Sequence, residues 1–528
     1  MTLAQATGVV ETRPKSRAAS ILGRHRHGTL VDLLLVAAAA LALRLPVVGF
    51  GLPTMLQPDE PGNINVGAEM AAHGDLDPHY FAYPSVLYDV EALADLAARL
   101  LTGHMLIAYS FTTQGMGINR TVNPHIVLGL RLITVAASVA ICLLVYGVIV
   151  RITRRRWVAV GCGLLAATSP LLVTNGVFIT PDTYSALTTA AALAGALAVV
   201  RRGTRRDYVL AGVAVGFAVG SKYDVAAVLP VVAAYVLREG RNAWRPHALT
   251  RRLSLAMAAA AAGFALTTPA VLFDTGSVYD GLTTQLTAYS TGHPGAEGGS
   301  LGYYLSALLH DQPVLLPGAA LALVAAGYGR FRKEIVVTAV FALANFILIA
   351  RETVRFDRDL LPLLPALILL NGFAAAWLAE LLARRRPGMM PRAGRLAVAT
   401  AVVVAALIPA VIGAAGVSET LDEAPRTEAA AWLEAHLPRG ASVVNENYGP
   451  WLETGAFNLT HVSYVLAVTL PVADPQAIIL TDEGSGRFMG DPKTYPAQAA
   501  VYKALLAQYC VSAKFTNGPW VEVLTPCG

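Results

Sequence analysis

The sequence predicts an α-helical protein that crosses a membrane many times and ends in a small extracytoplasmic α/β domain. Apolar residues make up 55% of the 528 positions and charged residues only 14%, whereas a soluble domain carries about a quarter charged residues. Apolar runs of roughly 15 to 25 residues recur along the chain, which is the length of a helix that crosses ~30 Å of hydrocarbon. The segment 417–528 is instead of mixed polarity.

We expect about eleven membrane spans from these apolar runs. They lie near 29–50, 125–150, 157–179, 184–200, 208–220, 224–237, 252–273, 313–328, 335–350, 360–382 and 396–416. The spans near 208–220 and 224–237 are short and meet at Gly220-Ser221-Lys222, so each is expected to be a half-length or tilted helix.

The basic residues predict the orientation of these spans. Arg and Lys cluster in 1–28, 151–156, 201–206, 238–252, 330–333 and 384–395, and these segments alternate with segments that are poor in both. The positive-inside rule places the basic segments in the cytoplasm, with the N-terminus inside and the C-terminus outside. The net charge of +5 therefore reflects membrane topology and is not evidence for a nucleic-acid partner. We expect a multi-pass protein of the plasma (inner) membrane.

Three parts follow from this topology. Residues 1–28 form a basic cytoplasmic terminus, residues 29–416 form the transmembrane domain with a long first outer loop at 51–124, and residues 417–528 form the outer α/β domain. In the tail, short helices are expected at 427–436 and 496–508, and strands at 442–445, 477–480, 509–515 and 520–525.

The cysteines of the tail are expected to pair. Asn517-Gly518 between the last two predicted strands is a hairpin signal, and that hairpin brings Cys510 and Cys527 together. A disulfide persists outside the cytoplasm. Two free thiols are the alternative.

Two adjacent carboxylates, Asp59 and Glu60, follow the first predicted span. Pro61 and Gly74 suit the first and the terminating position of a helix, so helix capping is one interpretation of the pair. We favour catalysis, with Asp59 the better candidate, because the acids lie at the mouth of a membrane bundle.

The polar loop behind this pair carries the candidate substrate-binding residues. They are His73, His79, Tyr83 and Tyr88. The segment 83–101 is expected to be a helix that is too charged to span the membrane and lies along its outer interface.

Asp182, in Thr180-Pro181-Asp182, is the third candidate catalytic acid. Its predicted depth matches that of Asp59, so both are expected to face one cavity, although an N-cap role is the simpler interpretation. Carboxylates in one cavity are possible ligands for a divalent cation: Mg or Mn with oxygen ligands, or Zn if a His joins them. Asp59 and Asp182 are the candidate metal ligands.

The candidate phosphate-binding groups are cationic. Lys222 lies between two short apolar helices, where an ammonium group is costly and usually functional, with Asp224 as a possible salt-bridge partner. The segment 351–359, here called the arginine loop, carries Arg351, Arg355 and Arg358 on the outer side. Guanidinium groups bind phosphate bidentately, but a solvated linker whose acids neutralise its bases explains the loop equally well.

In order and in sidedness, these motifs resemble the polytopic GT-C glycosyltransferases that use polyprenyl-phosphate sugars, which include bacterial aminoarabinose transferases and protein O-mannosyltransferases. The resemblance runs along most of the membrane part. The motifs that carry it are Arg44-Leu45, Asp59-Glu60, Tyr83-Pro84-Ser85-Val86-Leu87-Tyr88, Arg131-Leu132, Thr180-Pro181-Asp182, Ser221-Lys222 and Arg355-Phe356. The family often has Lys where this chain has Tyr83.

The resemblance implies an inverting transferase that moves a sugar from a polyprenyl-phosphate donor to a glycan, lipid or protein acceptor at the outer face. Asp59 would serve as general base or help to bind a metal, and Asp182 would assist in the same cavity. Lys222, Arg351 and Arg355 would hold the donor phosphate. The abundance of Ala, Val and Arg is typical of a high-GC bacterium, so an envelope acceptor is expected.

Two other classes of function remain open at this point. A flippase or transporter of lipid-linked sugars also needs a polar cavity and a broken helix pair, but the candidate residues all lie on the outer side. A binding protein that recruits partners through its tail is the second alternative, with aromatic residues of 417–528 available to bind sugar rings.

Overall fold

The computed structural model describes residues 16–527, except 53–56, 58, 104–123, 245–248, 294–295, 386–406, 418–420, 422–423, 453–454 and 463–473. The predicted basic terminus and most of the predicted span near 396–416 therefore lie outside the described residues. Leu407–Val417 is described as a short apolar helix.

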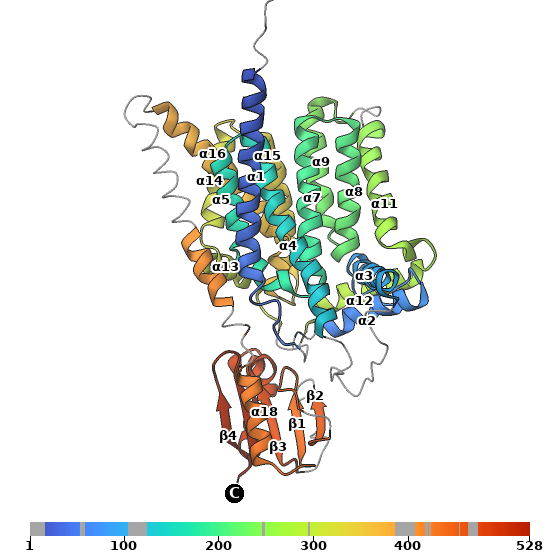
Figure 1. Cartoon of the computed structure of the whole chain (residues 1–528), viewed down its shortest axis with the longest axis vertical. Helices are drawn as coiled ribbons and strands as arrows, with labels where there is room; N and C mark the ends of the chain where they lie inside the picture. Colours follow the sequence, from blue (N-terminus) through green and yellow to red (C-terminus); the bar gives the residue numbers. More distant parts are fainter. Residues whose placement is uncertain are drawn as a thin grey trace, which may run out of the picture.

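The membrane part is a bundle of apolar helices that run side by side (Figure 1). Its helices are α1 (Ser16–Arg44), α4 (Pro124–Thr153), α5 (Arg156–Ala167), α6 (Pro170–Thr174), α7 (Pro181–Arg201), α8 (Arg205–Lys222), α9 (Val228–Glu239), α11 (Ser254–Thr267), α14 (Leu315–Gly327), α15 (Arg332–Arg351) and α16 (Leu363–Arg385). The chain also forms α2 (Glu60–His73), α3 (Val86–Thr102), α12 (Thr275–Thr291) and α13 (Ser300–Asp311).

Four of the described helices, α4, α7, α15 and α16, are long and apolar enough to cross a membrane. The number rises to six if the bent pairs each count as one span: the helices at 156–167 and 170–177, bent by 63°, and those at 300–311 and 315–327, bent by 96°. The shorter helices α8, α9 and α11 also fall on predicted spans. The total of about eleven spans stays a prediction.

The helices of the first outer loop pack at one end of the bundle. As predicted, α2 has Pro61 in its first turn and ends at Gly74, whose φ of 65° is in the left-handed region. The end of the bundle that holds α2, α3 and α12 is also the end that faces the C-terminal domain, whereas α1 begins at the opposite end (Figure 1).

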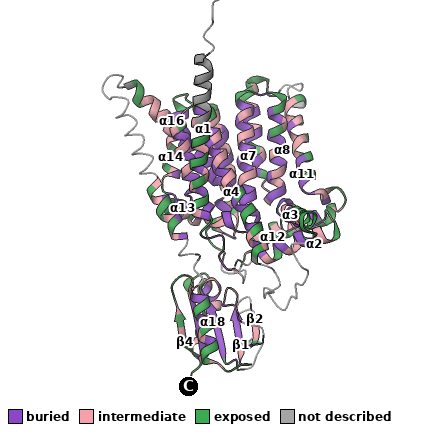
Figure 2. Ribbon diagram, viewed as in Figure 1, coloured by how far each residue is buried: buried purple, intermediate pink, exposed green. Residues whose placement is uncertain are grey.

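Helix α3 is amphipathic, but its buried face carries acidic side chains and its exposed face carries leucines. Glu91 and Asp95 are buried, whereas Leu93, Leu100 and Leu101 are largely exposed; Figure 2 shows the exposed part of α3. These two acids thus face the protein and the three leucines face outward, as expected of a helix that lies against lipid.

The C-terminal domain is an α/β unit, in agreement with the prediction. It consists of α18 (Ala424–His436), β1 (Ser442–Glu446), β2 (Asn458–Val462), β3 (Ala477–Thr481), α19 (Arg487–Gly490), α20 (Pro496–Leu506), β4 (Tyr509–Phe515) and β5 (Val521–Pro526). The strand order is β2-β1-β3-β5-β4; β1 runs parallel to β2 and β3, while β5 is antiparallel to β3 and β4.

Alternating residues of the buried strands fill the two faces of this sheet. Val443 and Ile479 pack with Leu433 of α18, whereas Val444 and Ile478 pack with Tyr502 of α20. This period of two is the geometry of a β-strand covered on both faces. A disulfide joins Cys510 to Cys527 across the β4–β5 hairpin.

A fully buried ion pair fixes α2 to the bundle. Arg131 of α4 donates to both carboxylate oxygens of Glu60, at 2.8 and 2.5 Å, and also to the carbonyl groups of Val48 and Phe50. Glu60 accepts a further bond from the Ile179 N–H at 3.0 Å. Both side chains are 0% exposed, so the pair joins four segments of chain inside the protein.

Replacing Arg131 by Met should destabilise the fold strongly. The change leaves Glu60 buried and uncompensated, which costs about 3–5 kcal/mol. Thermal unfolding of the detergent-solubilised variant measures the loss. The double variant Arg131→Met/Glu60→Gln should recover part of it, because the unpaired charge is then removed. An unchanged unfolding temperature in Arg131→Met would contradict this role.

Candidate active site

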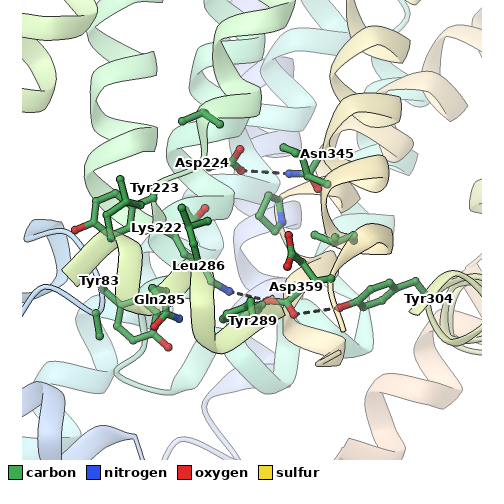
Figure 3. Close-up of a pocket in the computed structure, with 18 residues that line it drawn as sticks. Tyr83, Lys222, Tyr223, Asp224, Gln285, Leu286, Tyr289, Tyr304, Asn345 and Asp359 are labelled. Carbon is green, nitrogen blue, oxygen red and sulfur yellow. Dashed lines mark hydrogen bonds and ion pairs between the residues drawn. The ribbon is translucent and has the colours of Figure 1, made fainter. Parts of the chain in front are cut away.

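A cavity of about 190 Å³ lies at the level where α8 breaks from α9 (Figure 3). Its polar lining consists of Tyr83, Ser185, Lys222, Tyr223, Asp224, Gln285, Tyr289, Tyr304, Asn345, Glu352 and Asp359. Leu282, Leu286, Leu348 and Ile349 form an apolar wall. The cavity therefore has one charged side and one apolar side.

Lys222 lies at the charged side, held between two carboxylates. Its Nζ is 2.6 Å from Asp182 and 2.9 Å from Asp359, and both acids are almost completely buried. Tyr304 donates to the other oxygen of Asp359 at 3.1 Å, as Figure 3 shows. Lys222 ends α8, and the next residue, Tyr223, has a φ of 50°. This left-handed conformation is uncommon for a residue other than Gly and turns the chain sharply at the cavity.

The sequence-based suggestion that Asp224 pairs with Lys222 is wrong. Asp224 instead accepts from the Ala226 N–H at 3.1 Å and from the Asn345 amide at 3.3 Å. The turn at Tyr223 directs the two neighbouring side chains to different partners.

Arg358 connects the first outer loop to this cluster. Its guanidinium group is 2.5 Å from Asp59, at side-chain exposures of 23% and 36%. Burial by itself would lower the pKa of Arg358. The nearby carboxylates of Asp182 and Asp59 outweigh this effect, so the pKa of Arg358 is raised. The structure thus brings Asp59, Asp182, Lys222, Arg358 and Asp359 close together. Of these five residues, Lys222 and Asp359 line the cavity; the predicted roles of the others stay predictions.

This cluster holds more negative than positive charge. Asp59, Asp182 and Asp359 contribute three carboxylates, against the two cations Lys222 and Arg358, which leaves a formal charge of −1.

Tyr83 supplies a neutral hydroxyl group where the family often has Lys. Burial raises the pKa of Tyr83 to about 12, despite the opposing fields of Arg358 and Lys222. Burial also raises the pKa of Tyr289, which lines the same cavity. Both hydroxyl groups therefore stay protonated at neutral pH and are able to donate a hydrogen bond to a bound group.

Other predicted site residues lie elsewhere. Glu60 is engaged with Arg131 and Ile179, as described above, and is not among the residues that line the cavity. Tyr88 is completely buried in an apolar cluster, with its ring 6.4 Å from that of Tyr80. Neither side chain faces the cavity.

The two predicted histidines are on the surface of the outer loop. His73 contacts the Glu69 carbonyl at 3.1 Å, and His79 contacts the Asp75 carboxylate at 3.0 Å. The hydrogen bond to Asp75 is the main reason that the pKa of His79 is raised. Both histidines are exposed, and neither lines the cavity.

The other two arginines of the arginine loop are not at the carboxylate cluster. Arg351 is the exposed last residue of α15. Arg355 lies over the Tyr303 ring, with its Cζ 4.9 Å from the ring centre.

The carboxylate pair proposed as a metal site faces cations instead. Asp59 binds Arg358, and Asp182 binds Lys222. Among the residues that the structure describes, no group of three His, Cys, Asp or Glu side chains comes together to hold a metal ion. In this arrangement the donor set does not fit a divalent cation.

The prediction of the site from sequence missed several cavity residues. The sequence analysis placed Asp359 in the arginine loop but predicted no role for it. An acidic side chain in a loop with three arginines was the signal that could have marked it as a site residue. Tyr289, Tyr304 and Asn345 also line the cavity. They come from α12, α13 and α15, and nothing in their local sequence indicates that these helices meet.

The chain is similar to one protein family and to solved structures of one membrane protein. Residues 78–273 match the model of the dolichyl-phosphate-mannose-protein mannosyltransferase family. The matched segment includes Tyr83, Asp182 and Lys222; Asp59 and the arginine loop lie outside it. No curated protein sequence matches the chain.

The chain also resembles solved structures of ArnT from Cupriavidus metallidurans. The structure bound to undecaprenyl phosphate has 16% sequence identity and a TM-score of 0.50, with 96% of this chain and 98% of that chain covered. The apo structure has 18% identity and a TM-score of 0.48, with 93% and 97% covered.

At such identities the first of these matches establishes the fold. The predicted resemblance is therefore confirmed: the chain has the fold of the ArnT structure, and its residues 78–273 match the model of the dolichyl-phosphate-mannose-protein mannosyltransferase family.

Proposed function

We propose that this protein is a membrane glycosyltransferase that moves a sugar from a polyprenyl-phosphate donor to an acceptor hydroxyl group at the outer face of the plasma (inner) membrane. The observation that carries the proposal is the charged cluster formed by Asp59, Arg358, Asp359, Lys222 and Asp182 beside a cavity with an apolar wall. The acceptor class, an envelope glycan, lipid or protein, follows from the resemblance.

The cavity suits a phosphate attached to an isoprenoid chain. Leu282, Leu286 and Leu348 provide the apolar wall, and burying an isoprenoid against it is favourable at about 25 cal/mol per Å². Lys222 and Arg358 provide positive charge where a departing phosphate would need it. The Tyr83 and Tyr289 hydroxyl groups add neutral donors.

Donor binding would also prepare the base. Asp59 is held by Arg358, and a phosphate that takes the guanidinium group as its bidentate partner releases Asp59 toward the acceptor. Asp359 and Asp182 keep Lys222 in place from two sides, so the ammonium group remains at the cavity when Arg358 changes partner.

The transfer then proceeds as a single displacement. The acceptor hydroxyl group gives its proton to the Asp59 carboxylate as its oxygen forms a bond to the anomeric carbon. The bond from that carbon to the phosphate oxygen breaks, and its electron pair leaves with the phosphate, next to Lys222 and Arg358. Attack opposite the leaving group inverts the anomeric configuration.

Replacing Asp59 by Asn should abolish transfer and leave the fold intact. The amide cannot accept the proton, and loss of a general base lowers the rate about 10²- to 10⁴-fold. The measurement is release of polyprenyl phosphate from a labelled polyprenyl-phosphate sugar by the purified variant.

The matched control is Glu69→Gln, which neutralises an exposed carboxylate on the same helix and should keep full activity. Full activity in Asp59→Asn would exclude Asp59 as base. Movement of the intact labelled lipid across vesicles without sugar release would favour a flippase.

Replacing Tyr83 by Phe should weaken the use of the donor. The change removes one buried hydroxyl donor and keeps the ring, so we expect kcat/KM for the donor to fall about 5- to 20-fold, which corresponds to about 1–2 kcal/mol. Because the pKa of Tyr83 is raised to about 12, the hydroxyl group stays protonated, and the ratio of variant to wild type should be constant from about pH 6 to 9.

Steady-state kinetics across that pH range test this prediction. Tyr80→Phe, a substitution of a half-exposed tyrosine from the same loop that does not line the cavity, is the control. A loss in Tyr83→Phe that disappears toward high pH would show that the hydroxyl group ionises and would contradict the neutral-donor role.

A further inference from the structure

The arginine loop is bound along its first half by a second segment of the outer side. Glu297 and Val354 form an antiparallel β-bridge. The Arg355 N–H donates to the Ala296 carbonyl at 2.9 Å, and the Gly298 N–H donates to the Thr353 carbonyl at 3.3 Å. Backbone pairing thus fixes the position of the loop from 353 to 355.

The same segment is contacted by the C-terminal domain. The Tyr495 hydroxyl group donates to the Glu297 carboxylate, and the Glu297 N–H donates to the Tyr495 oxygen at 3.1 Å. One side chain of the C-terminal domain therefore holds both the backbone and the side chain of the residue that pairs with Val354.

Tyr495 is firmly held within its own domain. It is 8% exposed, and its ring lies edge-on to Phe488 at 5.3 Å. Phe488 in turn stacks on Tyr502, with 6.1 Å between the ring centres. The Tyr502 hydroxyl group donates to the Glu446 carboxylate at 2.6 Å.

Glu446 connects this series of contacts to the sheet of the C-terminal domain. It ends β1 and accepts from the Thr481 and Ser485 N–H groups, each at 2.9 Å. Burial raises the pKa of Glu446, and these hydrogen bonds oppose the rise. The contacts form a packed path from the end of β1 to the Tyr495 hydroxyl group.

On the other side of the bridge, the arginine loop enters the active site. Arg358 binds Asp59, and Asp359 binds Lys222. Only a few residues separate these side chains from Val354, so a shift of the bridged backbone moves the groups that hold the base and the ammonium group.

We propose that Tyr495 is a positioning residue of the active site: by docking on Glu297, the C-terminal domain sets the position of the arginine loop and of Arg358 and Asp359 within it. For its effect on catalysis, this inference rests on the proposed glycosyltransferase function. The structural coupling itself does not.

The test uses the full-length protein in detergent with Tyr495→Phe, which keeps the ring on Phe488 and removes the hydroxyl group. Hydrogen–deuterium exchange of peptides that cover 351–359 should become at least about threefold faster, with an unchanged unfolding temperature. In the transfer assay, kcat/KM for the donor should fall about tenfold.

Variants of the partner residue sharpen the test. Glu297→Gln keeps an oxygen that accepts the hydroxyl group and should stay near wild type. Glu297→Ala removes the carboxylate contact but keeps the backbone N–H that donates to Tyr495, so exchange of 351–359 should be faster than in wild type and no faster than in Tyr495→Phe. The double variant Tyr495→Phe/Glu297→Ala should be no worse than Tyr495→Phe, because the hydroxyl group takes part in both contacts. Tyr509→Phe, a buried tyrosine of β4, is the matched control and should change neither readout.

Each outcome is decisive. Unchanged exchange of 351–359 in both Tyr495→Phe and Glu297→Ala would overturn the coupling, whatever the enzymatic activity. Faster exchange in these variants, together with a wild-type protein that transfers no sugar from any polyprenyl-phosphate donor, would support the coupling and refute the proposed function instead.

Discussion

The site depends on two consecutive residues, Arg358 and Asp359, that bind different partners. Arg358 holds Asp59 at the start of α2, and Asp359 holds Lys222 at the end of α8, through which Asp182 of α7 is also fixed. One stretch of backbone therefore sets the relative positions of five charged groups. Removing Lys222 would leave Asp182 and Asp359 buried and uncompensated, at about 3–5 kcal/mol, so these three groups stay together, whereas the pair of Asp59 and Arg358 is more exposed. The irregular backbone after Lys222 is tolerated because it borders this polar cavity and not lipid.

Sidedness was the part of the site that could be predicted from sequence. The alternation of basic and non-basic segments predicted that Asp59, Asp182, Lys222 and the arginine loop lie on the same side, and the structure brings Asp59, Asp182 and Lys222 together with Arg358 and Asp359 of that loop. The local geometry could not be predicted in the same way. Glu60 follows Asp59 directly, yet successive residues of a helix point about 100° apart, so Glu60 turns inward to Arg131. His73 belongs to the same helix but lies about 20 Å further along its axis. The pairing of Lys222 with Asp359 joins residues 137 positions apart, and the nearer Asp224 is excluded only by the backbone turn at Tyr223.

In the C-terminal domain, too, local features could be predicted from sequence and long-range contacts could not. The short apolar runs in β1 and β3, which are buried on both faces of the sheet, and the hairpin before the C-terminus are local signals, and the predicted strands are present. Strand β2 was not predicted, because its residues Asn458 to Val462 carry a mixed burial pattern and gain their partner only by lying parallel to β1. The contact between Tyr495 and Glu297 spans 198 residues. No local pattern in either segment indicates that contact, although it fixes how the C-terminal domain meets the arginine loop.

The formal charge of −1 on the cluster constrains how a phosphate enters the site we propose. An anion cannot simply be added to three carboxylates and two cations in a partly desolvated space, because like charges repel strongly where water screens them poorly. One carboxylate has to give up its cation. Asp182 and Asp359 are 3% and 5% exposed, so losing Lys222 would leave them buried without compensation. Asp59 is 36% exposed and is stabilised by water once it is released. The exchange of partners is therefore cheapest at Arg358, and it frees the one carboxylate that can reach an acceptor arriving from the aqueous side.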